Sequence, residues 1–420
     1  MRFIHTSDWH LGQTLHTFER SFEHQHFLDW LLDTLVAEQA EGLLICGDIF
    51  DNANPSAASQ KQLYRFLQQA KTRVPHLNIV IIAGNHDSPG RLEAPAPLLE
   101  TLGATVIGFV ARLPDGAIDL ARLVVPLKNR LGEIAAWCLA IPFLRPGDVP
   151  RVEKGLETNT ETANDPYMEG IALLYRQALQ HALTLRQPGQ AIIALGHCHM
   201  VGGEISQDSE RRIVIGGTEA LPAGIFDPAI AYAALGHLHL AQSVGKQAHL
   251  RYCGSPLPMS FAEVNYPHQV LRVDLNGETV ADITALPVPR AVELLRVPKQ
   301  PAPLQEVLAA LAALALPDQA DLQRQPYLEV RVLLDAPEPG VRARVDAVLE
   351  GKPIRLAKID THYAVKTNNV NAPASLDQLE RLQPDDIFNR LYRTKYDADA
   401  PLELRAAFAE LMLNPVEDIH

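Results

Sequence analysis

The sequence of 420 residues has few cysteines, and it contains no hydrophobic run long enough to cross a membrane. Its four cysteines, at positions 46, 138, 198 and 253, are scattered and form no C-x-x-C pair, which argues against disulfides and favours buried free thiols. No apolar run approaches the roughly 18–20 residues that span a bilayer. The N-terminus also lacks a basic segment followed by an apolar one. We therefore expect a cytoplasmic protein with no membrane partner.

The sequence has no excess of basic residues either, since its formal net charge is −13. That balance argues against a surface coated in basic groups for nucleic acid. Residues 1–289 carry 21 basic and 30 acidic side chains, residues 290–370 carry 11 and 10, and residues 371–420 carry 5 and 10. Carboxylates that bind divalent cations would explain part of the acidity of the first segment. The hydrophobic content of 47% is ample for a large core, and the length predicts two or three domains.

Short buried strands alternate with amphipathic helices over the first hundred residues. β-branched and apolar runs predict the strands, and apolar residues at helical spacing predict the helices, with Ser56 as an N-cap. This alternation predicts an α/β sheet with right-handed crossovers. The expected strands are 2–6, 43–46 and 78–83, and the expected helices are 21–39, 56–70 and 91–102.

Polar residues of metal-binding types follow five of the expected strands. Asp8 and His10 follow the first, and because they alternate by two we expect both to point the same way on extended backbone. Strands at 134–141, 191–195 and 231–235 come later, and the last two also end in Gly and His. One such stretch would be an ordinary polar turn, but five would gather at one edge of an α/β sheet. The candidate ligands are Asp8, His10, Asp48, Asn85, His197, His237 and His239.

Mixed oxygen and imidazole ligands without a thiolate suit Mn²⁺, Fe²⁺ or Zn²⁺ better than Ca²⁺ or a structural zinc. Seven ligands are too many for one ion and fit two ions that share a bridge, for which Asp48 is the natural carboxylate. His86 is next to Asn85 and is our candidate for protonating the leaving group or stabilising the transition state, with Asp87 orienting it. We interpret His5 as a core histidine satisfied by hydrogen bonds, and His199 as a residue behind the ligands or on an exposed loop.

The second half of the chain divides at a proline-rich segment, 284–303. Beyond it the order strand, helix, strand, helix, strand predicts a small α/β capping domain, followed by two helices at 376–396 and 402–413. We expect domains at 1–285, 290–370 and 371–420. The C-terminal helices either pack on their own domain or dock another chain. A polar stretch at 150–165 is expected to be an exposed loop.

The ordered motifs D-x-H, G-D-x-x-D, G-N-H-D, G-H and G-H-x-H, from residue 8 to residue 239, resemble those of the calcineurin-like metallophosphoesterases. Four further segments resemble the SbcD family, bacterial exonuclease subunits related to the recombination nucleases that pair with SMC-like ATPases. The resemblance is strong over the catalytic domain and extends in layout to the cap and to Leu376–Tyr396. These segments are 5–12, 84–88, 141–146 and 252–256.

The resemblance implies a metallophosphoesterase β-sandwich flanked by helices, a capping domain that contacts DNA, and a C-terminal helical pair. It assigns one ion to Asp8, His10, Asp48 and His239 and the other to Asp48, Asn85, His197 and His237, and it gives His86 the catalytic role. It further implies two Mn²⁺ ions, although other divalent ions are possible. Arg91 and Arg145 are candidate contacts to substrate phosphate.

The family implies a nuclease in DNA repair, recombination and replication that degrades double strands from ends and cuts single strands or hairpins internally. Its partner would be an SbcC-like SMC-type ATPase that receives the C-terminal helices, in a heterotetramer built on a homodimer. Helices 56–70 and 91–102 are candidates for the dimer contact.

Three other functions compete with this one. A protein phosphatase would carry Asp-Arg-Gly after the second motif and Glu at the end of the third, where this chain has Asp51-Asn52-Ala53 and Asp87. A phosphodiesterase for small nucleotides would need neither the cap nor the C-terminal helices. A non-catalytic scaffold would be expected to have lost ligands, and all seven are present.

Overall fold

The computed structural model divides the chain into two compact units, residues 1–293 and residues 294–420. The division lies close to the boundary expected between 285 and 290. The predicted exposed loop at 150–165 lies, apart from its ends, outside the described residues. No helix in the described parts is long and apolar enough to cross a bilayer. The described residues are 1–150, 165–204, 220–316, 318, 321–336, 338–363, 384–396, 398–401, 404, 405 and 408.

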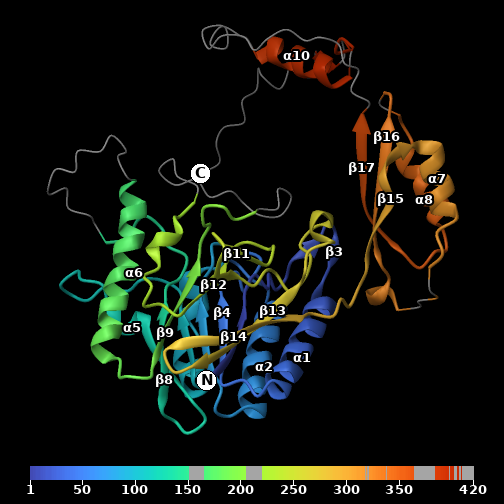
Figure 1. Cartoon of the computed structure of the whole chain (residues 1–420). Coiled ribbons are helices and arrows are strands. Elements are labelled where there is room, and N and C mark those ends of the chain that lie inside the picture. Colours follow the sequence, from blue (N-terminus) through green and yellow to red (C-terminus); the bar gives the residue numbers. More distant parts are fainter. Residues whose placement is uncertain are drawn as a thin grey trace. The chain divides into compact units, whose positions relative to one another are not determined.

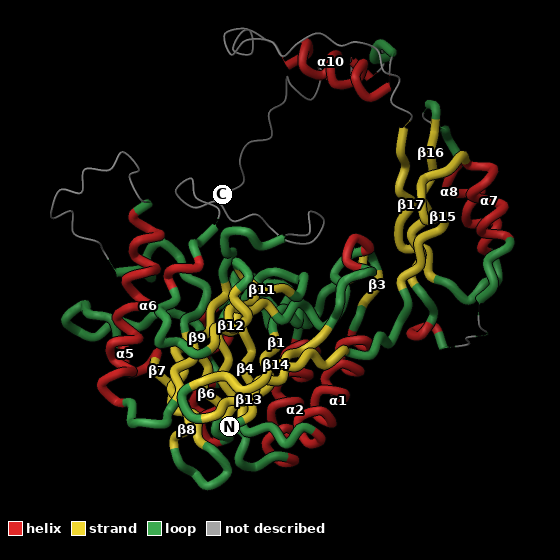
Figure 2. Tube along the Cα trace, in the orientation of Figure 1, coloured by secondary structure: helices red, strands yellow, loops and turns green. Residues whose placement is uncertain are grey.

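Unit 1 contains two six-stranded sheets (Figures 1 and 2). In the first, β1, β4, β5 and β6 run parallel, and β13 and β14 extend the sheet antiparallel beyond β1. The spatial order is β14 (Thr279–Pro287), β13 (Gln269–Asn276), β1 (Arg2–Thr6), β4 (Gly42–Cys46), β5 (Asn78–Ile82) and β6 (Ala104–Ile107).

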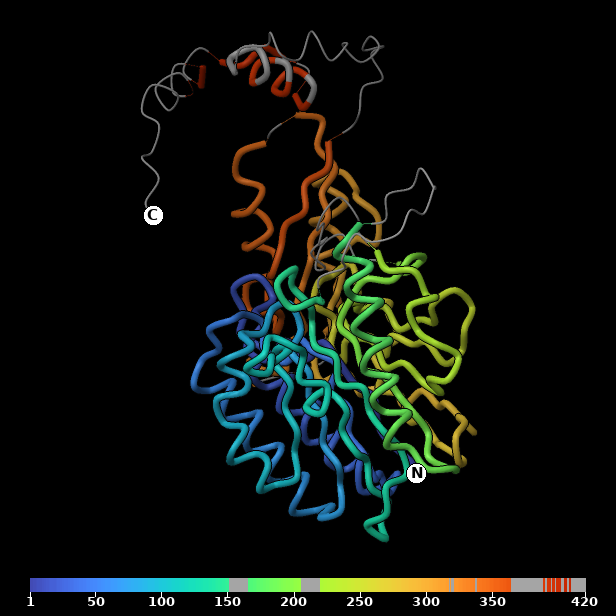
Figure 3. The backbone as a smooth tube through the Cα atoms, turned by 90° about the vertical axis from the view of Figure 1, so that its left-hand side faces the viewer, coloured from blue at the N-terminus to red at the C-terminus, as the bar shows by residue number. Residues whose placement is uncertain are grey.

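In the second sheet the four central strands, β12, β10, β9 and β8, run parallel. The edge strands β11 and β7 are antiparallel to their neighbours. The order is β11 (Gln242–Val244), β12 (Gln247–Tyr252), β10 (Tyr232–Gly236), β9 (Ala191–His197), β8 (Ile134–Ala140) and β7 (Val124–Lys128). In Figure 3 the early residues of unit 1, in blue and cyan, and the later green and yellow ones form two neighbouring halves.

The two sheets pack face to face and form the core of a sandwich. Residues of the first sheet alternate between its two faces, as side chains on a strand must. Phe3, Leu44 and Val80 pack toward the second sheet, in one cluster with Ile193 and Leu235. The intervening residues face the other way, into a second cluster that includes the helix residues Phe27 and Phe66. The β-sandwich implied by the family resemblance is therefore confirmed.

Helices cover the outer faces of the sandwich (Figure 1). The buried side of α1 (Ser21–Ala37) and α2 (Ala57–Arg73) packs on the first sheet, and that of α6 (Pro166–Leu185) packs in the core of the second. The predicted N-cap is correct, because the Ser56 side chain accepts from the backbone N–H of Ser59 at 3.1 Å. Shorter elements are β2 (Thr14–Leu15), β3 (Phe18–Glu19), α5 (Leu120–Leu123), η1 (Ala223–Ile225) and η2 (Phe261–Glu263) in unit 1 and η3 (Leu322–Arg324) in unit 2.

One expectation about local structure is wrong. The single helix expected at 91–102 is two short helices, α3 (Pro89–Glu93) and α4 (Ala96–Thr101), because Pro95 cannot continue a helix and restricts the residue before it. The proline-rich segment 284–303 contains the boundary between the two units, as expected. Much of it is strand, and only residues 288–293 separate β14 from β15 (Leu294–Pro303).

Unit 2 begins with β15 and alternates strand and helix as predicted. Its three strands are parallel in the order β15-β16-β17, and α7 and α8 contribute to the cluster that covers one face. The prolines of β15 are tolerated because this strand lies at the sheet edge and its register shifts between Val297 and Ala302. The other elements are α7 (Leu304–Ala312), β16 (Tyr327–Leu334), α8 (Val341–Leu349) and β17 (Arg355–Tyr363).

The first of the two expected C-terminal helices corresponds in part to α10 (Pro384–Tyr396). Its Phe388 ring stacks on that of Phe408, with centroids 4.4 Å apart. The Tyr396 ring lies edge-on to that of Tyr363 at 5.7 Å. Residues 404, 405 and 408 are the described part of the second expected helix, 402–413.

Candidate metal centre

The seven candidate ligands converge from both sheets of the sandwich. Asp8 and His10 follow β1, Asp48 follows β4 and Asn85 follows β5, and these three strands are neighbours in the first sheet. His197 ends β9 and His237 follows β10, its neighbour in the second sheet. Six of the seven are buried, and Asn85 is half-buried. The parallel strands deliver their carboxyl ends to one edge, which is why distant motifs meet there.

Several of these residues adopt a backbone conformation that only glycine adopts without strain. The φ angles are +54° at Asp8, +47° at His10, +49° at Asp48 and +101° at His237. Asp8 and His10 do belong to one group of ligand atoms, as expected, but the reason given for this is wrong, because they do not lie on extended backbone. Both residues have left-handed φ angles instead. Strained residues persist only where their surroundings hold them, and they cluster at functional sites.

Backbone hydrogen bonds join the first two motif loops side by side. The N–H of Asp8 donates to Gly47 O at 3.0 Å, and the N–H of His10 donates to Asp48 O at 3.0 Å. The third loop approaches just as closely, since a Cβ at Gly84 would collide with the backbone and carboxylate of Asp48. Glycine at this position is what allows Asn85 and Asp48 to lie together.

Two groups of ligand atoms that include Asp8 lie close enough to hold ions. One consists of Asp8, His10 and His239 and the other of Asp8, Asp48 and His197, with ligand atoms in each group within 4.8 Å of one another. Asp48 Oδ2 lies 3.7 Å from His10 Nε2 and 3.4 Å from His197 Nε2, between the two groups. Its position fits the bridging carboxylate predicted from the sequence.

Asn85 joins the second group through its side-chain oxygen. Asn85 Oδ1 lies 2.9 Å from His197 Nε2 and 3.1 Å from His237 Nδ1. His197 Nδ1 lies 2.8 Å from Cys46 O, and because a carbonyl only accepts, Nδ1 carries a proton. In the neutral imidazole, the lone pair of Nε2 would then face the oxygens of Asn85 and Asp48, which is favourable only if a cation or a proton lies between them.

The pKa values of His197, Asp48 and Asp8 depend on their burial and on the charged groups beside them. Burial would lower the pKa of His197, but the charges of Asp48 and Asp8 and the hydrogen bonds to Asp48 and to Cys46 O together outweigh it and raise that pKa to about 9. Burial would raise the pKa of Asp48, but the charges of His197, His10 and His86 and the hydrogen bond to His197 together hold it well below its usual range. Burial raises the pKa of Asp8. A proton on His197 thus supplies positive charge where a divalent ion would fit.

His10 provides an independent test of whether the site suits a metal. Its Nε2 is buried, and among the described residues it has no hydrogen-bond partner. Buried polar groups without partners are rare in folded proteins and require an explanation. Coordination to an ion between Asp8, His10 and His239 supplies one, and the residues present fit the group of ligands expected for two divalent ions.

His86 lies next to this cluster, and its imidazole is held by the second motif loop. Its Nδ1 lies 2.7 Å from Asp51 O, so Nδ1–H donates to that carbonyl. Its backbone N–H donates to Asp48 Oδ1 at 2.8 Å. The ring lies edge-on to that of His10, with centroids 4.9 Å apart. Nε2 is therefore the nitrogen that can serve a substrate.

Asp87 does not make the contact predicted for it. Its carboxylate accepts from the backbone N–H groups of Ile49 at 3.2 Å, Phe50 at 3.0 Å and Gly84 at 2.9 Å. These bonds join the second and third motif loops beneath the site. The Asp51 carbonyl, and not the Asp87 carboxylate, orients His86, because the Asp87 side chain turns inward to the backbone.

Sequence reasoning missed two carboxylates that contact candidate ligands. Asp51 Oδ1 lies 3.4 Å from His10 Nδ1. Glu263 Oε1 lies 2.9 Å from His239 Nδ1. Asp51 belongs to the G-D-x-x-D motif, whose last residue could have been examined as a partner of His10. Glu263 follows the last motif by 24 residues, and no sequence pattern points to it.

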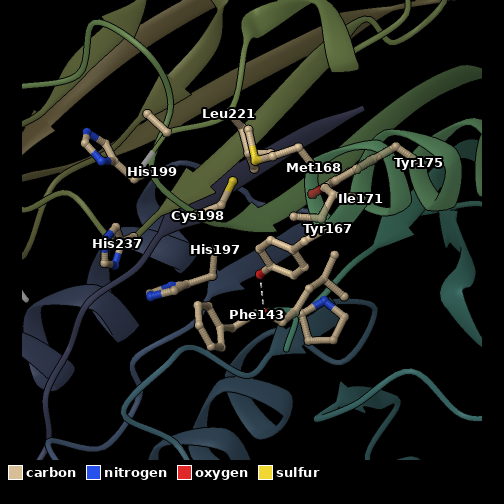
Figure 4. A pocket seen from close by; sticks show the side chains of 13 residues that line it. Phe143, Tyr167, Met168, Ile171, Tyr175, His197, Cys198, His199, Leu221 and His237 are labelled. Atoms are coloured by element: carbon tan, nitrogen blue, oxygen red, sulfur yellow. Dashed lines mark hydrogen bonds between the residues drawn. The ribbon is translucent and has the colours of Figure 1, made fainter. Parts of the chain in front are cut away.

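An apolar pocket adjoins the second group of ligands (Figure 4). His197, His199 and His237 lie along one side of it, and the Tyr167 hydroxyl donates to Leu144 O at 2.7 Å. The ring of His199 lies 6.3 Å from that of His237, and His199 belongs to no group of ligand atoms found in the described residues. The other lining residues are Pro142, Phe143, Met168, Ile171, Tyr175, Cys198, Ala220 and Leu221.

The two candidate substrate contacts lie in different settings. The Arg145 guanidinium lies over the ring of Phe143, 5.5 Å from its centroid, and Phe143 in turn lies edge-on to His197 at 6.3 Å. Arg91 is exposed on α3, the short helix that begins directly after the Gly84–Asp87 motif. Neither position tests the predicted contact with phosphate.

Comparison with known proteins yields two family models. Residues 1–241 match calcineurin-like phosphoesterases, and residues 290–396 match a domain described as type 5 capsule protein repressor C-terminal domain. A solved dimetal phosphatase from Danio rerio covers 69% of this chain and 99% of its own. Its sequence identity is 10% and its TM-score 0.35, a likeness too weak to support an argument.

Curated relatives match nearly the whole chain. The SbcD component of the nuclease SbcCD from Rhodobacter capsulatus is 42% identical over 390 residues, which cover 92% of this chain and 93% of the relative. The protein of the same name from Escherichia coli K12 is 33% identical, covering 93% and 92%. The one from Bacillus subtilis is 35% identical over 277 residues, covering 65% and 66%.

Proposed function

Because this chain belongs to the SbcD family of nuclease subunits and carries a calcineurin-like phosphoesterase domain, we propose that it hydrolyses DNA phosphodiesters with two Mn²⁺ ions. The substrates would be the ends of double strands, and single strands or hairpins cut internally, in repair, recombination and replication. The observation that carries this proposal is the convergence of seven ligands from five strand ends in one largely buried cluster.

The ligands divide between two ions. Asp8, His10, Asp48 and His239 would hold the first, and Asp48, Asn85, His197 and His237 would hold the second. When bound, the ions would supply Lewis-acid activation of the phosphodiester and of the attacking water. The contribution of the chain itself is to hold the lone pairs of these ligands in fixed directions, through the hydrogen bonds and the strained backbone described above.

His86 is the proposed general acid. Donation of Nδ1–H to Asp51 O fixes the ring, and Nε2 can carry the proton that the leaving oxygen needs. As a protonated imidazole it would also stabilise the charge that develops on the phosphoryl group. His86 belongs to neither group of ligand atoms that contains Asp8, although it forms a third such group with His10 and Asp51. Because the proposed role of its Nε2 is toward the substrate, we expect the loss of His86 to impair chemistry and to spare metal binding at the two proposed ion sites.

The proposed partner is an SbcC-like SMC-type ATPase that docks on the C-terminal helical segment. On α10 the side chain of Leu391 is 64% exposed, and that of Leu404, further along, is 44% exposed. Exposed apolar side chains beside the stacked rings of Phe388 and Phe408 suit a protein interface. A homodimer through α2 and the 91–102 segment remains our prediction, and Leu98 of α4, 72% exposed, would be covered by it.

The nuclease function is tested on hairpin and linear duplex DNA with Mn²⁺, with EDTA, and with the His86→Ala variant. We expect no cleavage in EDTA and a loss of about 10²–10⁴-fold in His86→Ala, the size typical of a lost general acid. His76→Ala, at an exposed histidine before β5, is the matched control and should retain full activity. Cleavage in EDTA, or full activity of His86→Ala, would refute the mechanism.

A small-nucleotide phosphodiesterase is separated from a nuclease in the same assay. Cleavage of dinucleotide or cyclic substrates with no cleavage of DNA would favour that alternative. The partner is tested separately by binding of the ATPase to the full chain and to a chain that ends near residue 370. Equal binding by both would remove the docking role.

A further inference from the structure

We infer that Glu263 is a positioning residue of the metal centre, whose carboxylate fixes the tautomer and orientation of His239. The inference rests on the proposed metal-dependent function, and it adds a residue that lies outside every motif of the family resemblance. It concerns the first ion site, formed by Asp8, His10, Asp48 and His239.

Glu263 is fully buried, at the end of the short helix η2. Its Oε1 lies 2.9 Å from His239 Nδ1, and its Oε2 accepts from the backbone N–H of Met259 at 2.7 Å. Each carboxylate oxygen therefore has a donor of its own. Burying a carboxylate costs free energy unless partners compensate for its charge, so a buried carboxylate beside a candidate ligand points to a role for this group.

The segment between His239 and Glu263 folds back and places the Glu263 carboxylate beside the His239 ring. The backbone N–H of Ser255 donates to His239 O at 3.1 Å, and the Ser255 hydroxyl donates to Leu257 O at 2.8 Å. Gly254 has a φ of +81°, and a Cβ there would press on His239 O. The turn at 254–255 thus folds the segment over the backbone of His239, so that η2 can approach the ring of the same residue.

The chemistry of the contact determines which nitrogen coordinates. An ionised carboxylate only accepts hydrogen bonds, so Nδ1 of His239 must carry the proton and Nε2 must carry the lone pair. A carboxylate behind an imidazole also makes the other nitrogen a stronger donor to a metal. By contrast, the second site's His197 has the neutral carbonyl of Cys46 behind its Nδ1. Glu263 therefore acts on the affinity of one site more than the other.

Glu263→Gln separates this role from a purely structural one. If the amide oxygen keeps the hydrogen bond from Met259, the NH₂ group faces Nδ1 of His239 and donates to it. Nδ1 then becomes the acceptor, and the proton moves to Nε2, where it blocks coordination. The substitution changes one atom and keeps the shape of the side chain, so it perturbs the tautomer more than the packing.

The experiment is a titration of the full-length protein with MnCl₂, followed by calorimetry and by the electron paramagnetic resonance of free Mn²⁺. We expect two sites in the unmodified protein and a 10–100-fold loss of affinity at one of them in Glu263→Gln. Glu329→Gln is the matched control. Glu329 is a buried glutamate of unit 2 that contacts Arg296 and Lys358, and its substitution should leave both Mn²⁺ affinities unchanged.

Two further variants keep the inference testable if Glu263→Gln folds poorly. Glu263→Asp keeps the buried charge but withdraws it by one methylene, and we expect a smaller loss at the same site. In His239→Ala the first site is already weakened, so adding Glu263→Gln should not lower the Mn²⁺ affinity of that site any further. Unchanged Mn²⁺ affinity in Glu263→Gln, or additive losses in the double variant, would overturn the inference. Absence of Mn²⁺ binding by the unmodified protein would instead refute the proposed function.

Discussion

Substitution of Asp87 by Asn distinguishes a residue that serves His86 from one that holds the backbone beneath the site. The carboxylate is buried and accepts from three backbone N–H groups, those of Ile49, Phe50 and Gly84. Asn has only one oxygen. Even if that oxygen takes the position that serves Ile49 and Gly84, the N–H of Phe50 is left facing an NH₂ group.

A buried donor that loses its acceptor costs about 1–3 kcal/mol, so Asp87→Asn should lower the free energy of unfolding by about that amount. Asp87→Ala removes all three acceptor contacts and should lower it by roughly 3 kcal/mol or more. His86→Ala, at a half-buried residue, should change it by less. If Asp87 only oriented His86, as expected from the sequence, its substitution would lower the cleavage rate as much as His86→Ala does. It would leave the free energy of unfolding almost unchanged.

The assay is urea unfolding in EDTA, which removes any contribution from bound ions, followed by nuclease rates with Mn²⁺. Asp33→Asn is the control, because Asp33 pairs with Arg73 on the surface and its loss should cost within about 0.5 kcal/mol. The reasoning is refuted if Asp87→Asn is as stable as this control while its cleavage rate falls to that of His86→Ala.

Three further predictions concern pH, backbone space and metal. Burial lowers the pKa of His5 to about 3, so the unfolded chain takes up the proton first and the stability that His5 contributes falls as pH drops below 6.5. Between pH 7.5 and 5.5 the share of His5 in the loss should be about 1.4 kcal/mol, so the loss measured by urea unfolding should be smaller by that amount in His5→Gln. Gly84→Ala should displace Asp48 and abolish Mn²⁺ binding in a titration, whereas Gly90→Ala, with open space around it, should bind normally. Mn²⁺ at 100 times its dissociation constant should stabilise the protein by about 2.7 kcal/mol for each occupied site, seen as a higher melting temperature than in EDTA.

The convergence of the candidate ligands could be predicted from the sequence, because they follow buried strands. The carboxyl ends of parallel strands lie at one edge of the sheet, so polar residues that directly follow apolar runs are expected to meet there. The same logic identified His5 correctly as a core histidine. Its Nε2 lies 3.2 Å from Leu235 O and its Nδ1 lies 2.9 Å from the Tyr232 hydroxyl.

The supporting contacts could not be predicted, because they depend on how loops fold back in three dimensions. Glu263 reaches His239 only through the turn at 254–255, and no periodicity encodes that return. Asp87 follows His86 directly, which suggested a partnership, but its backbone directs the side chain inward. The break in the helix at Pro95 could have been predicted, because proline cannot continue a helix. The strand through the prolines of 298–303 could not, since it depends on β15 lying at the edge of its sheet.

The candidate ligands come from two sheets, so the proposed activity depends on how the interior of the protein packs. Asp48 and Asn85 follow strands of the first sheet, and His197 and His237 lie at strand ends of the second, so the spacing of the proposed second ion site is set by how the two sheets pack. A cavity or an added methyl group in the core between Leu44 and Leu195 would slide one set of ligands past the other. Core substitutions in the sandwich should therefore change the metal affinity, even where the substituted residue contacts neither the ions nor the DNA.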